Sequence, residues 1–473
     1  MSTLTAPEKW SYAIGNMPFA VKDAAFANFV VFYYTQIHGL SGSLAGLAMF
    51  IALTWDAVSD PVVGSWSDNF RSRWGRRHPL LVLGGVPTAA LFLALFTPPE
   101  SVGQAGIFFW LLGVSILLRT FLTIYFIPYT AMGAELSTDY DERTVIAKAR
   151  VTMGWLAGMA LPAIAFVVFF GPANGEDGRL VADNYWHYGI LSAIVAGVAA
   201  LICIVGTRSV IPRLPAANPK AKFSWRDPFD DLLLAFQNRN FRLSTGANLA
   251  FGMSAGVYTT LALYLGTYFW EFSTDQLAGA VLPSAMGTLV AFTVLSRLGQ
   301  RFDKPYLLAA SSLALALNAF WFIGSRLLGF FPDNGHPYIY VFFLLNTGIA
   351  VFMIVSMQVL AASLAADIVD EQELVTGRRQ EGVVFAASAF VQKATIGAGA
   401  LLGGIVIDMS GINADSVPGA VDANVLQSLG WFTLAMTGGL ALVAFFFNTR
   451  LRLDRNVHTQ VRMQLAAVAD TKD

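Results

Sequence analysis

The sequence predicts an all-α membrane protein with twelve transmembrane helices in two pseudo-symmetric six-helix halves. Three observations support this: the composition, the recurrence of long apolar runs, and the distribution of charge between loops. Of 473 residues, 55% are hydrophobic and 13% are charged, whereas soluble domains are about 25% charged. A soluble chain of this composition would expose too much apolar surface. The composition and the net charge of −1 exclude a soluble enzyme, a disordered protein and a nucleic-acid-binding protein.

The apolar runs recur along the whole chain. Each can cross about 30 Å of hydrocarbon as a helix that rises 1.5 Å per residue. Barrel strands are excluded because they would alternate over about ten residues. The helices expected in the first half cover residues 14–37, 43–66, 79–97, 105–134, 150–171 and 187–207. Those expected in the second half cover residues 242–271, 278–297, 305–324, 338–366, 381–407 and 427–447.

A polar stretch rich in proline, lysine and aspartate separates the two groups of helices. We expect an N-terminal half at 1–207, a cytoplasmic linker at 208–241, a C-terminal half at 242–448 and a cytoplasmic tail at 449–473. Residues 224–237 of the linker are expected to form a short helix on the membrane surface. Two equal halves predict a secondary transporter whose site lies between them near mid-membrane.

Loop charge predicts the orientation. Arginine and lysine gather in the loops after the second, fourth, sixth, eighth and tenth spans and in the tail, whereas the opposite loops are mainly acidic. Positively charged loops stay in the cytoplasm, so both termini are expected there. The first ten residues do not have the pattern of a cleavable signal.

Two carboxylates fall within the second expected span, in the segment Thr-Trp-Asp-Ala-Val-Ser-Asp-Pro at 54–61. Asp56 and Asp60 are four residues apart and therefore share one face of a helix. At low dielectric constant they cannot both stay ionised unless a cation or proton joins them. With Ser59 and a threonine from another helix, they predict an oxygen-lined cation site. The alternative is a structural pair in which each carboxylate bridges to an arginine or lysine.

Polar and ionisable side chains in other spans are candidates for a substrate cavity, because charge within a membrane is costly. They are Lys22, Asp23, Arg150, Gln358 and Lys393. Lys22 otherwise pairs with an aspartate to hold helices together, and Arg150 otherwise extends to the cytoplasmic interface. Lys393 is expected to contact the substrate or the acidic pair, with a purely structural pairing as its alternative. Arg119 in the fourth span is open to either role.

The loop after the second span carries a charged motif, which we call the cytoplasmic gate motif. Its members are Asp68, Arg71, Arg73, Arg76 and Arg77. It predicts a set of ion pairs that break when the halves move, with simple anchoring by positive charge as the alternative. A second cluster before the eleventh span is expected to pair with basic loops of the other half or to be a solvated turn. It comprises Asp367, Asp370, Glu371, Glu373, Arg378, Arg379 and Glu381.

No enzyme constellation competes with a transport function. The sequence has no P-loop motif and no histidine spacing typical of a metal site. We therefore expect neither an enzyme nor an ATP-driven pump. No cofactor is expected, and the only bound ion would be a coupling Na⁺ or H⁺.

These motifs resemble those of the glycoside–pentoside–hexuronide:cation symporters, the melibiose permease family within the major facilitator superfamily. The resemblance runs through nearly the whole chain. Its segments are Ser-Tyr at 11–12, Tyr-Tyr-Thr at 33–35, Trp-Asp-Ala-Val-Ser-Asp-Pro at 55–61, Arg-Ser-Arg-Trp-Gly-Arg at 71–76, Ile-Pro-Tyr at 127–129, Ala-Asp-Ile-Val-Asp at 366–370, and Thr-Gly-x-Arg-x-Glu-Gly at 376–382. The resemblance implies a major facilitator fold and a cation at Asp56 and Asp60. Ser59 stands at the family's asparagine ligand, and Thr123 at its fourth-span threonine. Lys393 and Arg150 match the family's eleventh-span lysine and fifth-span arginine.

The chain departs from this family where melibiose permease binds its sugar. Its first-span aspartate falls on Ala20, its fourth-span aspartate on Phe126, and its neighbouring tryptophan on Thr130. A pocket with two carboxylates that grip sugar hydroxyls is therefore not expected. Lys22 and Asp23 repeat the family's Lys-Asp pair one helical turn later, which allows a compensating shift.

We expect a cation-coupled symporter that moves a small solute, a sugar or glycoside, by alternating access. One alternative solute is a hexuronide. A second alternative is a lysolipid or other amphipath, because the resemblance includes vertebrate lysolipid symporters. A third is a non-transporting membrane receptor or scaffold. The expected location is the plasma membrane, the inner membrane of a bacterium. The expected partners are the bilayer and the solute, without nucleic acid, and a monomer is favoured.

Overall fold

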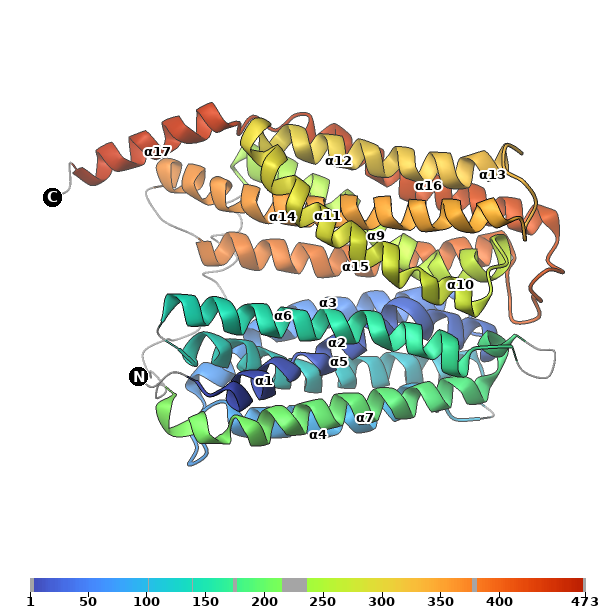
Figure 1. The fold of residues 1–473 in the computed structure, drawn as a ribbon, viewed down its shortest axis with the longest axis horizontal. Helices are drawn as coiled ribbons and strands as arrows, with labels where there is room; N and C mark the ends of the chain where they lie inside the picture. Colours follow the sequence, from blue (N-terminus) through green and yellow to red (C-terminus); the bar gives the residue numbers. More distant parts are fainter. Residues whose placement is uncertain are drawn as a thin grey trace.

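The computed structural model describes residues 4–100, 102–137, 139–172, 177–214, 236–376 and 381–470. Across these ranges the chain is almost entirely helical and contains no β-strand. Two helical bundles lie side by side, one from each half of the sequence (Figure 1). Eleven of the described helices are long and apolar enough to cross a membrane, judged by length and composition. The predicted fold class is therefore confirmed.

The N-terminal bundle covers the first six expected spans; five of them are among these eleven helices, and the first is divided into shorter elements. Its elements are α1 (Ala6–Ile14), α2 (Met17–Ala25), the π-helical turns η1 (Phe26–Val30) and η2 (Tyr33–Ile37), α3 (Gly42–Asn69), α4 (His78–Leu95), α5 (Gln104–Glu135), α6 (Tyr140–Ile164) with η3 (Ala165–Phe169), η4 (Gly178–Leu180), α7 (Ala182–Gly206) and η5 (Arg208–Arg213).

The C-terminal bundle contains the other six. Its elements are α9 (Arg239–Tyr264) with η6 (Leu265–Phe269), α10 (Thr274–Gly279), α11 (Val281–Arg301), α12 (Lys304–Ala319) with η7 (Phe320–Gly324) and α13 (Ser325–Leu327), α14 (Pro337–Thr376), α15 (Glu381–Ser410), α16 (Ala423–Asn448) and α17 (Arg455–Asp470). Most of the helix expected at 224–237 lies outside the described residues.

The first span is interrupted, which the sequence did not predict. The chain bends between α1 and α2, and this leaves backbone carbonyls without their helical partners. Two buried tyrosines of α5 donate to carbonyls at this break. The Tyr125 hydroxyl donates to the Gly15 carbonyl at 2.9 Å, and the Tyr129 hydroxyl donates at 2.8 Å to the Tyr12 carbonyl, which also accepts from the Gly15 amide. The interrupted span thus keeps its polar backbone paired inside an apolar bundle.

The C-terminal bundle also extends further than expected. α14 continues to Thr376, so the acidic cluster before the eleventh span begins on a helix and not in a loop. The tail forms α17, and its His458 lies 3.1 Å from Asp370 on α14. Figure 1 shows α17 projecting at the end of the molecule where both termini lie.

The two bundles meet closely at the opposite end, through α3 and α15. Asp408 on α15 accepts hydrogen bonds from the backbone amides of Gly42 (2.6 Å) and Ser43 (2.8 Å) at the N-terminus of α3. A carboxylate is favourable there because the first amides of a helix lack partners. A Cβ atom on Gly404 would collide with the Gly42 carbonyl, so glycine is what permits this approach.

Hydrogen bonds between the halves extend this contact. Thr35 on η2 bonds to the Tyr264 hydroxyl at the end of α9. The Tyr268 hydroxyl donates to the Gln36 side chain at 2.7 Å. All four side chains are buried. The halves are therefore joined by a packed and hydrogen-bonded seal at the end away from the termini.

Candidate cation and substrate site

Asp56 and Asp60 lie side by side on α3, as their spacing predicts. The Thr123 hydroxyl on α5 is 3.1 Å from an oxygen of each carboxylate. A hydroxyl has one hydrogen and can donate to only one of them at a time. Three oxygens from two helices therefore converge on one small volume. The structure brings Thr123 to the pair, as the family resemblance implies.

Two cationic side chains also reach this pair. The Arg119 guanidinium on α5 is 3.2 Å from Asp56, and the Lys393 ammonium on α15 is 3.3 Å from Asp56. Lys393 forms a second, closer ion pair with Asp60. Two positive charges thus balance two negative ones. In this conformation the acidic pair has the ion-paired arrangement that was the alternative to a bound cation, and its cation-binding role stays a prediction.

The two carboxylates differ in exposure. The Asp56 side chain is 7% exposed and that of Asp60 is 28% exposed. Arg119 is buried, with its guanidinium 4.7 Å from the centre of the Phe26 ring, which holds it in place. Asp56 is therefore enclosed and fixed, whereas Asp60 remains accessible.

Ser59 does not join the carboxylate oxygens. Its hydroxyl donates to the Asp56 backbone carbonyl at 3.2 Å. In addition, no group of three or more His, Cys, Asp or Glu side chains that could hold a metal ion occurs in the described part of the chain. In this conformation the side-chain oxygens of the predicted site come from Asp56, Asp60 and Thr123.

Lys22 and Asp23 pair with each other at 2.6 Å. Lys22 is buried, with its ammonium 4.1 Å from the centre of the Phe19 ring, and Phe19 stacks on Phe126 at 4.0 Å. The Asp23 side chain is largely exposed. Both residues lie on α2, so this ion pair does not hold two helices together. The substrate contact of either residue and the pairing of Lys22 between helices stay predictions.

The other substrate candidates are spread over separate elements. Arg150 is half-buried on α6, and its backbone carbonyl accepts a hydrogen bond from Asn16 at 3.1 Å. Gln358 is exposed on α14. Lys393 is committed to the two aspartates. Of the five predicted substrate residues, only Lys393 joins the acidic pair by a direct contact.

The cytoplasmic gate motif forms a compact cluster within the N-terminal half. Arg77 pairs with Asp68 (2.8 Å) and with Glu135 at the end of α5 (2.6 Å), and Arg76 also pairs with Glu135 (2.6 Å). Arg71 and Arg73 are exposed. Sequence reasoning missed Glu135, although it is the acidic residue that closes the fourth span. The predicted opening and closing of the gate is not tested by this single conformation.

The acidic cluster on α14 pairs within its own half, so the expectation of partners in the other half is wrong for three members. Asp367 bonds to Lys304 (2.5 Å), Asp370 to His458 (3.1 Å) and Glu371 to Asn238 (2.9 Å). Helix α17 supplies one of these partners, and no helix was predicted in the tail. Arg378, Arg379 and the Glu381 side chain lie outside the described residues.

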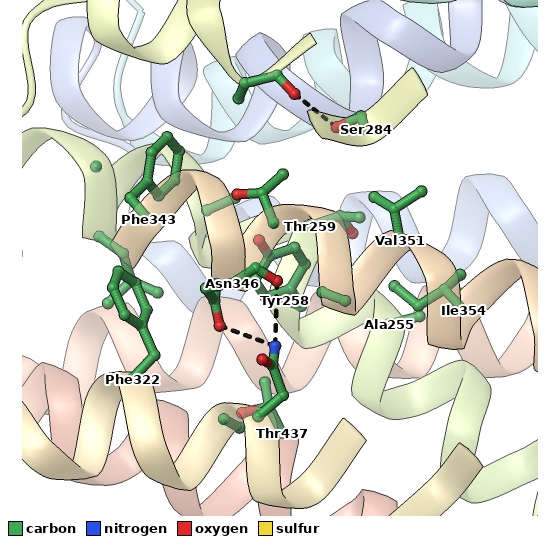
Figure 2. A pocket seen from close by; sticks show the side chains of 18 of the residues that line it. Ala255, Tyr258, Thr259, Ser284, Phe322, Phe343, Asn346, Val351, Ile354 and Thr437 are labelled. Atoms are coloured by element: carbon green, nitrogen blue, oxygen red, sulfur yellow. Dashed lines mark hydrogen bonds between the residues drawn. The ribbon is translucent and has the colours of Figure 1, made fainter. Parts of the chain in front are cut away.

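A cavity of about 300 Å³ lies mainly in the C-terminal half, with Asn28 and Phe166 reaching it from the N-terminal half. Figure 2 shows side chains from α9, α11, α14 and α16 around it. None of the five predicted substrate residues lines it. Sequence reasoning missed its buried amides, Asn318 and Asn346, although asparagines within apolar spans are a usable signal.

The chain matches a known protein family over most of its length. The family model described as MFS/sugar transport protein matches residues 11–455. An uncharacterized symporter of Synechocystis is 24% identical, over 97% of this chain and 96% of its own length. A putative glycoside/cation symporter of Escherichia coli, YagG, is 25% identical over 88% of this chain and 85% of its own.

Solved structures share the fold. The inward-open xylose transporter XylE of Escherichia coli superposes with a TM-score of 0.60 at 12% identity, over 94% of this chain and 96% of that one. At this identity the likeness establishes the fold alone. Because the family model covers most of the sequence, the chain is an integral membrane protein that belongs to the MFS/sugar transport protein family.

Proposed function

We propose that the protein is a symporter that moves a sugar or glycoside across the membrane by alternating access, driven by a cation gradient. The observation that carries this proposal is the pair of the buried Asp56 and the partly exposed Asp60, which form ion pairs with Lys393 from the opposite half. These ion pairs join the two halves. Binding of a cation to the carboxylates would break them, so cation binding and movement of the halves would be coupled. The family and the symporter names of its relatives support the same function.

The exchangeable member of the cluster is Asp60. Arg119 and its contact with Phe26 hold Asp56, whereas Lys393 offers a flexible ammonium to the more exposed carboxylate. In our proposal, a cation arrives at Asp60 and displaces Lys393. Release of Lys393 removes this ion pair between α15 and α3 and so lowers the barrier to movement of the halves.

The direction of the open side follows from the expected topology. With both termini in the cytoplasm, the seal at Gly42, Asp408, Thr35 and Tyr264 faces outward. The conformation would then be inward-facing, with Asp60 accessible after the cation has left. Lys393 would occupy the place of the departed ion.

We propose H⁺ as the coupling ion in preference to Na⁺. A proton needs a single carboxylate oxygen, whereas a metal ion needs several convergent oxygens. Here Ser59 bonds to backbone, and Arg119 already neutralises Asp56. Asp60 is therefore left as the one carboxylate available to a proton.

The lysolipid alternative is the weaker one. A cavity of about 300 Å³ is small for a long acyl chain, and no basic side chain lines it to receive a phosphate among the described residues. The receptor alternative predicts no solute movement at all.

The test is uptake of radiolabelled lactose and xylose, and of 4-nitrophenyl glycosides, by proteoliposomes with an imposed pH gradient, an imposed Na⁺ gradient, or neither. We expect accumulation above equilibrium with the pH gradient, inside alkaline. Accumulation with Na⁺ alone would contradict H⁺ coupling but keep symport. Uptake that only equilibrates under every gradient would contradict symport itself.

A further inference from the structure

We propose that the cavity in the C-terminal half is a binding site for an uncharged glycoside, whose sugar hydroxyls meet Asn346, Thr347 and Tyr258 and whose apolar substituent meets an aromatic wall. This inference rests on the proposed function and deepens it. It assigns the sugar site to residues other than Asp56, Asp60 and Lys393. It also predicts that neutral sugars bind in preference to acidic ones.

A buried hydrogen-bond network orients Asn346. The Asn318 side-chain amide donates to the Asn346 side-chain oxygen (2.8 Å) and to its backbone carbonyl (3.2 Å) (Figure 2). Trp321 in turn donates to the Asn318 side-chain oxygen at 3.0 Å. Both polar atoms of the Asn318 side chain therefore have hydrogen-bond partners, and so does the side-chain oxygen of Asn346. The Asn346 amide nitrogen has no partner in the described part of the chain, so it is a preoriented donor at the cavity.

Two hydroxyls at the same cavity also lack partners. Thr347 is 8% exposed, and its hydroxyl makes no hydrogen bond within the described ranges. No hydrogen bond of the Tyr258 hydroxyl is found there either, and Tyr258 lines the same cavity as Asn346 (Figure 2). Buried polar groups are normally paired. Unpaired ones that line a cavity indicate a ligand that supplies the missing bonds.

Other hydroxyls of the cavity provide the contrast. Ser254 donates to the Thr437 carbonyl (3.0 Å), Thr437 to the Thr433 carbonyl (2.7 Å), and Ser284 to the Ala280 carbonyl (2.7 Å). These groups are satisfied by the protein. The free groups are therefore confined to a few positions, where a sugar hydroxyl can both donate and accept.

The lining restricts the charge of the ligand. No Asp, Glu, Lys, Arg or His side chain lines the cavity among the described residues. A hexuronide carboxylate would be buried there without a counter-charge, which is strongly unfavourable. The ligand is accordingly neutral, and its size is limited because about 300 Å³ is at the lower end for small-molecule pockets.

Aromatic rings form one wall of the site. Phe322 and Trp270 stack with their ring centres 4.3 Å apart, and Phe343 contributes a further ring. Figure 2 shows Phe322 and Phe343 on the same side of the cavity. Such a surface suits an aromatic or alkyl substituent. Asn28 and Phe166 complete the site from the other half, so a bound ligand contacts both moving parts.

The test measures binding to the purified full-length protein by equilibrium dialysis, with 4-nitrophenyl glucoside, galactoside and xyloside, and with 4-nitrophenyl glucuronide as the charged match. We expect at least one neutral glycoside to bind at least tenfold more tightly than the glucuronide. Thr347→Val and Tyr258→Phe should each weaken that binding by about fivefold to tenfold. Neither should lower the melting temperature, because neither hydroxyl has a protein partner.

Thr433→Val is the matched control. Thr433 is buried on the same bundle, its hydroxyl bonds to the Leu429 carbonyl, and it does not line the cavity. Its glycoside affinity should equal that of the wild type. Three results would each overturn the proposed site. They are equal affinity for the glucuronide and the neutral glycosides, no binding of any neutral glycoside, and unchanged affinity in both cavity variants. If the site fails but gradient-driven uptake persists, the symport proposal stands without this site. If the glycoside binds as expected but no gradient drives its uptake, the symport proposal fails and the site stands.

Discussion

Lys393 is the residue on which the charge balance between the two halves depends. It is the cationic side chain from the C-terminal bundle that reaches Asp56 and Asp60 in this conformation. Lysine suits this role because its compact charge sits on a flexible stem, whereas the guanidinium of Arg119 is held by Phe26. In our proposal the two cations are therefore not equivalent, since Arg119 stays in place and Lys393 is displaced.

Lys393→Met tests this difference. Methionine keeps the apolar stem but removes the charge, so Asp60 loses its competitor for a cation. Protons should stabilise the variant against heat at lower concentration than they stabilise the wild type. We expect the proton concentration that gives half of this stabilisation to fall at least tenfold, since one charged contact is worth about 1.5–3 kcal/mol. Gradient-driven accumulation should be lost. Thermal stability followed against pH measures the first effect, and an unchanged pH dependence would contradict competition at Asp60.

The site could be predicted in part from the sequence. The spacing of Asp56 and Asp60 fixes a shared helix face, and the family resemblance adds Thr123 and Lys393. The role of Arg119 could not be settled, because a position in a span gives depth in the membrane but not the neighbour that a side chain faces. The same reason hid the Asn318–Asn346 pair, since hydrophobic runs do not report how helices rotate against each other.

At the scale of elements, α1 is anchored by a buried carboxylate. Glu8 accepts a hydrogen bond from Ser209 on η5 at 2.6 Å and lies 3.4 Å from Arg213. The Ser209 hydrogen bond outweighs burial and lowers the pKa of Glu8 below its ordinary value of 4.5. This carboxylate therefore stabilises the fold above the pKa of the unfolded chain. The contribution is lost as pH falls through the lower pKa of the folded state.

Glu8→Gln should accordingly destabilise the protein at pH 7 by about 1 kcal/mol, because a hydrogen bond to a charged group is worth about 1.5–3 kcal/mol and a neutral one about 0.5–1.5 kcal/mol. The difference from wild type should shrink as pH falls below 4.5 and through the lower pKa of the native carboxyl. Thermal unfolding in detergent at several pH values measures it. A difference that stays constant down to pH 3 would show that the ionised form is not what anchors α1.

The contact between α3 and α15 depends on the absence of a side chain at Gly404. Gly404→Ala places a Cβ against the Gly42 carbonyl and should separate the helices at the sealed end. Overpacking of this kind costs about 1–3 kcal/mol. Gly439→Ala is the control, because a Cβ there meets nothing within 4 Å. The melting temperature of Gly404→Ala should be lower than that of Gly439→Ala. Equal melting temperatures would mean that the seal tolerates separation of the two helices.

The lengths of the elements were predicted less well than their existence. The break in the first span is accompanied by hydrogen bonds from two α5 tyrosines, which a hydropathy profile cannot reveal. α14 passes the end of its apolar run because its acidic turn finds Lys304 and His458 as partners. Both outcomes depend on contacts between elements distant in sequence, whereas apolar runs define only the membrane-crossing part.

For the whole molecule, the seal between the halves predicts which side is accessible. Gln36 is buried beneath it and accepts a hydrogen bond from Tyr268. With both termini in the cytoplasm, Gln36→Cys should react slowly with a membrane-impermeant maleimide added outside. Val417→Cys, at a position 58% exposed, should react quickly. The native Cys203 is buried and gives little background. Equal rates for the two variants would contradict an inward-facing resting state.

The account as a whole requires that neutralisation of Asp60 powers transport, and Asp60→Asn tests this most directly. The variant should exchange glycoside across the proteoliposome membrane down its own gradient, as measured by counterflow, because its solute cavity is intact. It should accumulate none above equilibrium when a pH gradient is imposed, whereas the wild type does. Accumulation by Asp60→Asn at the wild-type level would contradict the coupling role assigned to this carboxylate.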